Sequence, residues 1–265
     1  MAYLKWRELS RVEIEQLDKQ NTVVLVPVGS MEQHGPHLPV SCDTLITEAV
    51  LDGLAARAGD LQVLATPTLW FSKSDEHRGF AGTLYLRRET FARQLLELSE
   101  SIALSGFRKL VFLNGHGGNT QIISLMLRDI REHTGMMTFL IYLGTFYGNY
   151  IKLHHLDEWD IHAGYLETSL LLHSYPELMR GRVLPGEGGG KPGEKLLKTF
   201  EGYQYLQPEG GEVSVGWNTI DYTDDGVIGN ASLANPQTGK DYLDCSITET
   251  LAALREISRF NFIEA

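Results

Sequence analysis

Short apolar runs alternate along this chain with longer segments of helical periodicity, and this alternation limits its possible folds more than any other feature. Residues 22–28 (TVVLVPV) form a continuous, β-branched run, as expected for a strand covered on both faces. Residues 88–106 place large apolar side chains at three- and four-residue steps, which is typical of an amphipathic helix. Further strands are expected at 61–65, 109–113 and 137–143, and further helices at 44–58, 119–133, 164–173 and about 238–260.

This order of elements predicts an α/β fold, a three-layer α/β/α sandwich with a mostly parallel central sheet. Parallel strands are joined by crossover helices that cover both faces of the sheet. In such sheets, ligands bind just beyond the carboxyl ends of the strands. The segments that follow the expected strands are therefore the first place to look for functional residues.

The composition argues against several classes of function. The length of 265 residues suits a single domain spanning 1–265, and the net charge of −11 argues against a nucleic-acid surface. The chain start lacks the pattern of a signal peptide, and no apolar run approaches the ~20 residues of a membrane span. The two cysteines, Cys42 and Cys245, argue against a disulfide scaffold and favour a reducing, cytoplasmic location.

Residues 185–235 form a long, Gly-rich and poorly periodic excursion within this domain. A stretch of this kind inside a compact domain is often a lid or a binding loop. A plain surface excursion is the alternative.

A dense group of metal-binding side chains follows the first long strand. Glu32 and His34 are two residues apart, so in an extended segment they point to the same side. Asp43 follows shortly afterwards, and this density of oxygen and nitrogen donors predicts a divalent-metal site. His37 lies beyond the turn at Pro36 and is expected to support the ligands or to contact substrate. Because Asp43 also precedes an expected helix, capping of that helix is an alternative role for its carboxylate.

His116 lies in a second cluster, NGHGGN at 114–119, between an expected strand and an expected helix. Flanking glycines let the backbone approach a ligand closely, so Gly117 is a candidate substrate contact. A phosphate-binding loop is the competing interpretation. The segment lacks the Lys-Ser/Thr of a P-loop and the G-x-G-x-x-G spacing, and the central histidine favours metal.

A third cluster contains His162 and Glu167, which are five residues apart. They would not share one face of an ideal helix, but both can face one site if His162 lies in the loop before the helix. Trp159 is expected to form an aromatic wall of the substrate site. His77, in a separate polar loop, is a further candidate for the pocket, although loop histidines often have no such role.

In their order and spacing, these motifs resemble the creatininase (creatinine amidohydrolase) family. The matching segments are EQHGPHLP at 32–39 with Asp43, NGH at 114–116, and HAG at 162–164 with ETS at 167–169, and the stretch 76–83 also fits. The resemblance covers about residues 20–175. It implies an α/β/α sandwich, hydrolysis of C–N bonds that are often in cyclic amides, two divalent ions (zinc, manganese or iron), and a homohexamer.

The resemblance also implies a role for each donor: one ion bound by Glu32 and His116, the other by His34, a bridge from Asp43, and acid–base catalysis by His162. True creatininases carry a metal-binding Glu at the position of Gly118. The second ion therefore lacks this ligand unless Glu167, also a candidate catalytic residue, supplies it. Relatives with this glycine variant include deformylases of pyrimidine intermediates and hydrolases of other cyclic substrates, so creatinine is not the expected substrate.

We therefore expect a metal-dependent amidohydrolase that cleaves a C–N bond in a small, cyclic amide or a formamide with metal-activated water. One alternative is a hydrolase that acts on another bond, for example by C–C cleavage or ring opening in a cyclic polyol or ketone. Another is a non-catalytic metal-binding protein. The donor set suits Zn, Mn and Fe alike.

Overall fold

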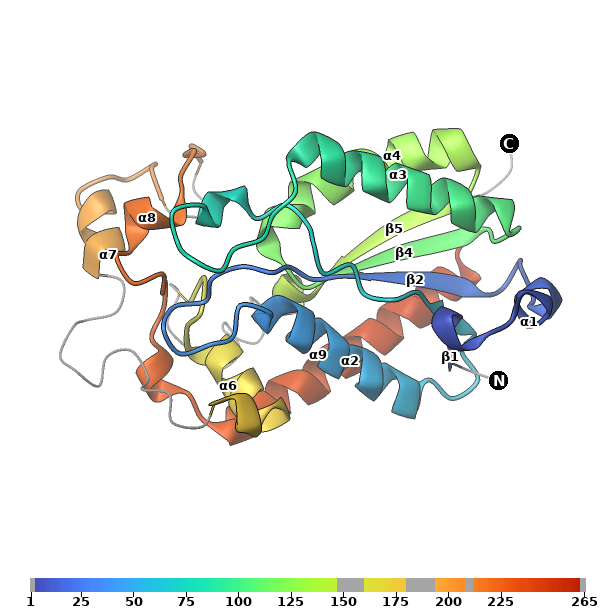
Figure 1. The fold of residues 1–265 in the computed structure, drawn as a ribbon, viewed down its shortest axis with the longest axis horizontal. Helices are drawn as coiled ribbons and strands as arrows, with labels where there is room; N and C mark the ends of the chain where they lie inside the picture. The colour runs from blue at the N-terminus through green and yellow to red at the C-terminus, as the bar shows by residue number, and fades with distance from the viewer. Residues whose placement is uncertain (1–2, 147–159, 180–193, 208–211, 263–265) are drawn as a thin grey trace.

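Five strands form one parallel sheet in the order β1-β3-β2-β4-β5 (Figure 1). The computed structural model describes residues 3–146, 160–179, 194–207 and 212–262. The strands are β1 (Tyr3–Lys5), β2 (Val23–Val28), β3 (Val63–Ala65), β4 (Lys109–Asn114) and β5 (Met137–Tyr142). All four pairings between neighbouring strands are parallel, as the alternation of strands and helices predicts.

The described helices are α1 (Arg11–Gln16), α2 (Cys42–Arg57), α3 (Arg88–Leu104), α4 (Thr120–Thr134), α6 (Tyr165–Ser174), α7 (Glu194–Phe200), α8 (Thr219–Tyr222) and α9 (Pro236–Arg259). Short 3₁₀ turns lie at Trp6–Glu8, Asp75–His77, Gly117–Asn119, Pro176–Met179 and Ala231–Leu233. Each strand and helix expected from the sequence is confirmed, with its ends within two residues of the expected ones. The short elements β1, α1, α7 and α8 were not anticipated, because they lack a clear apolar period.

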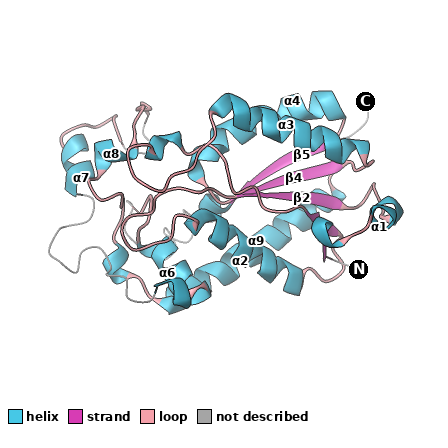
Figure 2. Ribbon diagram, viewed as in Figure 1, coloured by secondary structure: helices cyan, strands magenta, loops and turns pink. Residues whose placement is uncertain are grey.

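The two faces of β2 belong to two different hydrophobic cores. Val24 and Val26 pack with α3 and α4, whereas Val23 and Leu25 pack with α2 and α9. The side chains alternate in this way because successive residues of a strand point to opposite faces. Helices therefore cover both sides of the sheet (Figure 2), and the three-layer α/β/α arrangement is confirmed.

The chain connections diverge where β2 and β4 lie side by side. The chain leaves β2 for α2 on one face of the sheet, and it leaves β4 for α4 on the other face. The connections diverge at this point, which is where ligands bind in open α/β sheets. Val28 and Asn114 are register partners at the carboxyl ends of the two strands, so the predicted donor loops begin beside each other.

Helices α6 and α9 approach closely because α9 carries Gly239 at the contact. A Cβ atom at residue 239 would lie 1.9 Å from the Ser169 carbonyl oxygen and 2.4 Å from its carbonyl carbon. These are backbone atoms of α6, so α6 would have to move to make room. Gly239 therefore sets the position of the helix that carries Glu167.

Gly239→Ala is expected to lower the free energy of unfolding in a urea titration. Overpacking typically costs about 1–3 kcal/mol, and a backbone contact of 1.9 Å places this site at the upper end of that range. This cost exceeds the roughly 1 kcal/mol by which Ala is favoured over Gly in a helix. Gly216→Ala is the control, because a Cβ atom there has no neighbour within 4 Å. Equal stabilities of the two variants would contradict this account.

Part of the excursion at 185–235 reaches the carboxyl end of the sheet, although residues 185–193 and 208–211 lie outside the described part. Helices α7 and α8 lie at one end of the molecule (Figure 1). Thr219 contacts His77, and Ile228 forms a β-bridge with His162. A role of this segment as a lid stays a prediction.

Within the described residues, no helix has the length and apolar character needed to cross a membrane.

Candidate metal centre

The loop that leaves β2 is held against the start of α2. The backbone N–H of Glu32 donates to the Val40 carbonyl at 2.8 Å, and Gly35 makes the intervening turn with a φ of 65°. This left-handed conformation is one that glycine adopts without a steric penalty. The folded loop brings Glu32 and His34 beside Asp43 in the first turn of α2.

One group of donor atoms is centred on His116. Its Nδ1 atom lies 3.0 Å from Asp43 Oδ2 and 3.2 Å from Glu32 Oε2. Its Nε2 atom is 3.0 Å from the Lys73 carbonyl, to which an Nε2–H donates. This outer hydrogen bond fixes the ring and leaves the Nδ1 lone pair for a metal ion, the usual arrangement of a metal-binding histidine.

A second group of donor atoms is centred on His34. Its Nε2 atom lies 3.2 Å from Asp43 Oδ1 and 3.7 Å from Glu167 Oε2. The Nδ1–H of His34 donates to the Glu32 carbonyl at 3.3 Å. The Ala163 N–H donates to Glu167 Oε2 at 2.6 Å, and Ala163 reaches this position with a φ of 54°, uncommon for a residue with a side chain.

Asp43 joins the two groups because each of its oxygens faces a different imidazole. Ser30 Oγ donates to Oδ2 at 2.6 Å, which holds the carboxylate in this orientation. Helix α2 begins at Cys42, and Asp43 lies within its first turn rather than at the N-cap position. The alternative that Asp43 serves as the helix cap is therefore wrong, because its oxygens are turned toward His34, His116 and Ser30.

The donor atoms fit a bound cation. Glu32 is 1% exposed, and neither of its carboxylate oxygens accepts a hydrogen bond from the residues that the structure describes. A buried carboxylate without such a partner is costly unless a cation compensates it. Two ligands of a tetrahedral ion with bonds of ~2.0 Å lie about 3.3 Å apart. In each group, the imidazole nitrogen lies 3.0–3.7 Å from two carboxylate oxygens, and these separations lie around this value.

The electrostatics of the centre also favour positive charge. Burial raises the pKa of Glu167 to about 8, and the nearby Asp43 carboxylate adds to the rise. Burial likewise raises the pKa of Glu32. The pKa of Asp43 is held well below its usual range, because His34 and His116 outweigh the effect of burial. In place of protons on the two imidazoles, a divalent cation can balance the negative charge of the Asp43 carboxylate.

The other predicted histidines lie around this centre. His162 Nδ1 lies 3.7 Å and His77 Nε2 3.4 Å from Glu32 Oε1, and the two rings are tilted at a centroid distance of 4.3 Å. His162 lies before α6, as its proposed role beside Glu167 requires. His37 is fully buried and contacts Thr168 Oγ1 at 2.9 Å.

The described structure does not test substrate contact by two further candidates, Gly117 and Trp159. A Cβ atom at Gly117 would lie 3.0 Å from the Tyr142 hydroxyl, so the backbone there is tightly packed. Trp159, expected as an aromatic wall, lies outside the described residues. Substrate contact by Gly117 or Trp159 therefore stays a prediction.

Gly118, the position at which the family resemblance implies a metal-binding Glu in true creatininases, lies against the side chain of Glu76. A Cβ atom at this position would lie 2.0 Å from Glu76 Oε1 and 2.5 Å from His116 Nε2. Glu76 Oε1 is 3.4 Å from His116 Nε2, and its other oxygen pairs with Lys73. The volume that a longer side chain would need is thus filled by a carboxylate from another loop.

Sequence reasoning missed Glu76 and Gln33 as members of this site. Both lie in segments that match the family, and both stand directly beside a candidate histidine, which are the local signals that could have drawn attention to them. Their contacts come from segments far apart in the chain: Glu76 with His116, and Gln33 with His77 and His162.

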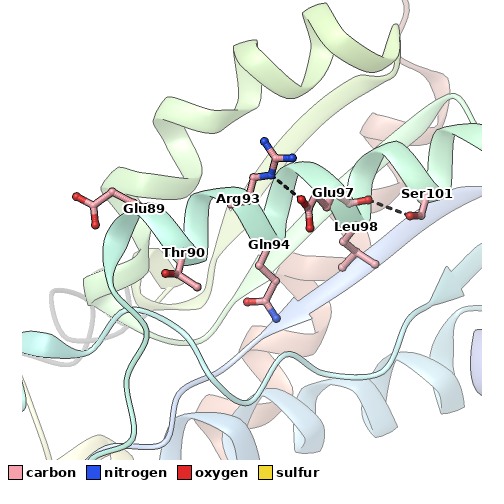
Figure 3. Close-up of a pocket in the computed structure, with 7 residues that line it drawn as sticks. All are labelled: Glu89, Thr90, Arg93, Gln94, Glu97, Leu98 and Ser101. Atoms are coloured by element: carbon pink, nitrogen blue, oxygen red, sulfur yellow. Dashed lines mark hydrogen bonds and ion pairs between the residues drawn. The ribbon is translucent and has the colours of Figure 1, made fainter.

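A separate pocket lies along α3 and does not resemble a metal site (Figure 3). Its lining residues all come from this one helix: Glu89, Thr90, Arg93, Gln94, Glu97, Leu98 and Ser101. The carboxylate of Glu97 pairs with Arg93 at 2.5 Å, and that of Glu89 pairs with Arg88 at 2.7 Å. Arginines on the same helix thus neutralise both carboxylates.

The sequence matches the model of the family described as "Creatininase: Creatinine amidohydrolase" over residues 7–254. It is 38% identical over 199 residues to the mycofactocin precursor peptide peptidase of Mycobacterium ulcerans, covering 73% of this chain and 74% of that protein. It is 26% identical to the 3-dehydro-scyllo-inosose hydrolase of Thermotoga maritima, covering 95% of this chain and 83% of that protein.

The fold matches solved structures of the same family. The structure named "Creatininase Mn" aligns with a TM-score of 0.74 and 25% identity, covering 96% of this chain and 98% of the other. The family match extends to residue 254, well beyond the motifs at 20–175 on which the resemblance was based. This chain therefore belongs to the creatininase (creatinine amidohydrolase) family and is a hydrolase.

Proposed function

We propose that this protein is a metal-dependent amidohydrolase that cleaves a C–N bond in a small amide or formamide with water. The proposal rests chiefly on Asp43, whose two oxygens lie 3.2 Å and 3.0 Å from two different imidazole nitrogens, on His34 and His116. Two divalent ions can share one carboxylate when each of its oxygens faces a different group of ligands, as the oxygens of Asp43 do.

Each donor group would hold one ion. Glu32, Asp43 and His116 would bind the first, and His34, Asp43 and Glu167 the second. Glu167 would thus supply the ligand that true creatininases take from the position of Gly118. When bound, such ions lower the pKa of water toward ~7 and polarise a carbonyl oxygen. Zinc, manganese and iron are all compatible with this set of oxygen and nitrogen donors.

His162 is oriented to move a proton in this reaction. Its Nε2–H donates to the Gln33 carbonyl at 2.8 Å, so the lone pair of the neutral ring is on Nδ1. Nδ1 faces the donor groups, 3.7 Å from Glu32 Oε1. His162 would therefore take a proton from the attacking water and pass it to the leaving nitrogen, a role typically worth ~10²–10⁴-fold in rate.

The relatives support an amide as the substrate without specifying which one. The mycobacterial relative is named a peptidase, and the family is named for an amidohydrolase. His37, His77, Gly117 and Trp159 are proposed to contact substrate. The relative from Thermotoga maritima, named an inosose hydrolase, favours one second candidate, which is hydrolytic opening of a cyclic polyol ketone. Assembly into a homohexamer and a cytoplasmic location stay predictions.

Glu167→Gln tests the metal assignment. The variant is expected to retain one tightly bound divalent ion per chain and to lose the second, because the amide carries no charge. Metal analysis after dialysis measures this, and turnover on linear peptides, formamides, cyclic amides and cyclic ketones identifies the bond. Glu177→Gln, at an exposed site just after α6, is the matched control. Full occupancy of both ions in Glu167→Gln would remove Glu167 from the ligand set.

A further inference from the structure

The side-chain amide of Gln33 is placed between two histidines of the site. Its Nε2 atom lies 2.9 Å from His77 Nδ1, 3.1 Å from the Gly226 carbonyl and 3.2 Å from His162 Nε2. Gln33 is 5% exposed, so solvent contributes little to these contacts. It stands between the proposed ligands Glu32 and His34 in the sequence, and its own side-chain nitrogen contacts two histidines.

Two backbone groups fix which end of the Gln33 amide is the nitrogen. The Gly35 N–H donates to Gln33 Oε1 at 2.9 Å, and Gln33 Nε2 donates to the Gly226 carbonyl at 3.1 Å. The reversed amide would place two donors together at Gly35 and two acceptors together at Gly226. Since one hydrogen on Nε2 is committed to Gly226, the other is directed to His77 Nδ1.

This contact determines the tautomer of His77. An amide N–H can only donate, so Nδ1 of His77 must accept and cannot carry a proton. The proton of the neutral ring is therefore on Nε2, which faces Glu32 Oε1 at 3.4 Å. His162 Nε2–H already donates to the Gln33 carbonyl, so its 3.2 Å contact with the amide nitrogen is not a hydrogen bond.

The tautomer matters because Glu32, His77 and His162 form a third group of possible metal ligands. All three side chains are buried, and one donor atom from each lies within 4.8 Å of the other two. His162 presents a lone pair to this group, and Glu32 presents a carboxylate oxygen. His77 presents an N–H instead, and a protonated ring nitrogen cannot bind a cation.

We propose that Gln33 is a positioning residue that keeps His77 in its Nε2–H tautomer and thereby prevents Glu32, His77 and His162 from holding a third divalent cation. A cation there would occupy the Nδ1 lone pair of His162 and draw Glu32 away from the first ion. This inference rests on the proposed function only in counting two bound ions before the third. The tautomer of His77 follows from the hydrogen bonds alone.

Thr219 is the rival for this role, since its Oγ1 lies 3.0 Å from the same His77 Nδ1. A hydroxyl can donate or accept, so it tolerates either tautomer, whereas the amide N–H tolerates only one. Thr219 is fully buried and can be replaced by Val with little change in volume, which makes Thr219→Val the matched control.

The test is the ¹⁵N spectrum of the full chain labelled at histidine, recorded without metal and after loading with Zn²⁺. The His77 signals are assigned by their loss in His77→Gln. We expect Nε2 protonated and Nδ1 unprotonated in the wild type and in Thr219→Val. In Gln33→Glu, the carboxylate accepts from Nδ1–H, so the proton moves and metal analysis shows one additional Zn²⁺ per chain.

If Gln33→Glu does not fold, Gln33→Met replaces it in the experiment. Methionine has no N–H to donate to His77 Nδ1, so this variant is expected to give a mixture of the two His77 tautomers. A proton on Nδ1 of wild-type His77 would overturn the proposal. So would a change of tautomer in Thr219→Val with none in the Gln33 variants, or an unchanged metal count in a folded Gln33→Glu. Failure of the wild type to bind two ions, with the expected tautomer, would refute the proposed function and leave this inference standing.

Discussion

Asp43→Asn is expected to remove both divalent ions and nearly all hydrolytic activity. Each oxygen of Asp43 faces a different histidine, so this side chain is the one shared by both donor groups. The amide of Asn offers one neutral oxygen and an N–H₂ group that cannot bind a cation. Bound metal typically contributes several kcal/mol of charge stabilisation to the transition state. At 1.36 kcal/mol per tenfold, its loss corresponds to a fall in kcat/KM of roughly 10³-fold or more.

Metal analysis and thermal unfolding check this result independently of any substrate. Added Zn²⁺ or Mn²⁺ should raise the Tm of the wild type, because a ligand that binds the native state stabilises it, and should leave that of Asp43→Asn unchanged. Asp60→Asn is the control, since the Asp60 side chain is 91% exposed and pairs with Arg255 at the surface. Retention of one ion by Asp43→Asn would show that the two groups bind metal independently.

His162→Asn is expected to lower kcat by ~10²–10⁴-fold, the usual contribution of a general acid–base group. Both ions should remain bound, because Glu32, His34, Asp43, His116 and Glu167 are unchanged. Steady-state kinetics and metal analysis on the same sample separate the two effects. The exposed His133 of α4 provides the control His133→Asn.

A different outcome for His162→Asn would be equally informative. His162 also lies near His34 and Glu167 as a potential metal ligand. If the variant loses one ion together with its activity, then His162 binds metal and the assignment of proton transfer is wrong. If it keeps both ions and full activity, then another group carries the proton.

The order of elements and the location of the candidate site could be predicted because both depend on local patterns. A strand covered on both faces requires a continuous apolar run, as in β2, and an amphipathic helix requires an apolar stripe, as in α3. Parallel strands end at one edge of the sheet, so the loops after β2 and β4 had to come together. The donor types in those loops then indicated a divalent metal.

The partners of each donor could not be predicted, because hydrogen bonds and close packing join residues far apart in the chain. Nothing near Gly118 indicates that Glu76 occupies the space above it. Nothing near Gln33 indicates that Gly226 fixes its amide. The N-cap alternative for Asp43 was reasonable on local grounds and failed because Ser30, His34 and His116 turn its carboxylate inward.

The chain's own pattern of apolar and donor residues is thus enough to indicate an α/β/α hydrolase with candidate metal ligands at the ends of β2 and β4, since strand and helix periods and ligand chemistry are properties of short segments. Which oxygen of Asp43 faces which histidine, which ring nitrogen of His77 the Gln33 amide contacts, and which side chain lies against residue 118 became visible only once the chain was folded. These features depend on separations of a few ångströms between distant segments, and packing alone sets those separations.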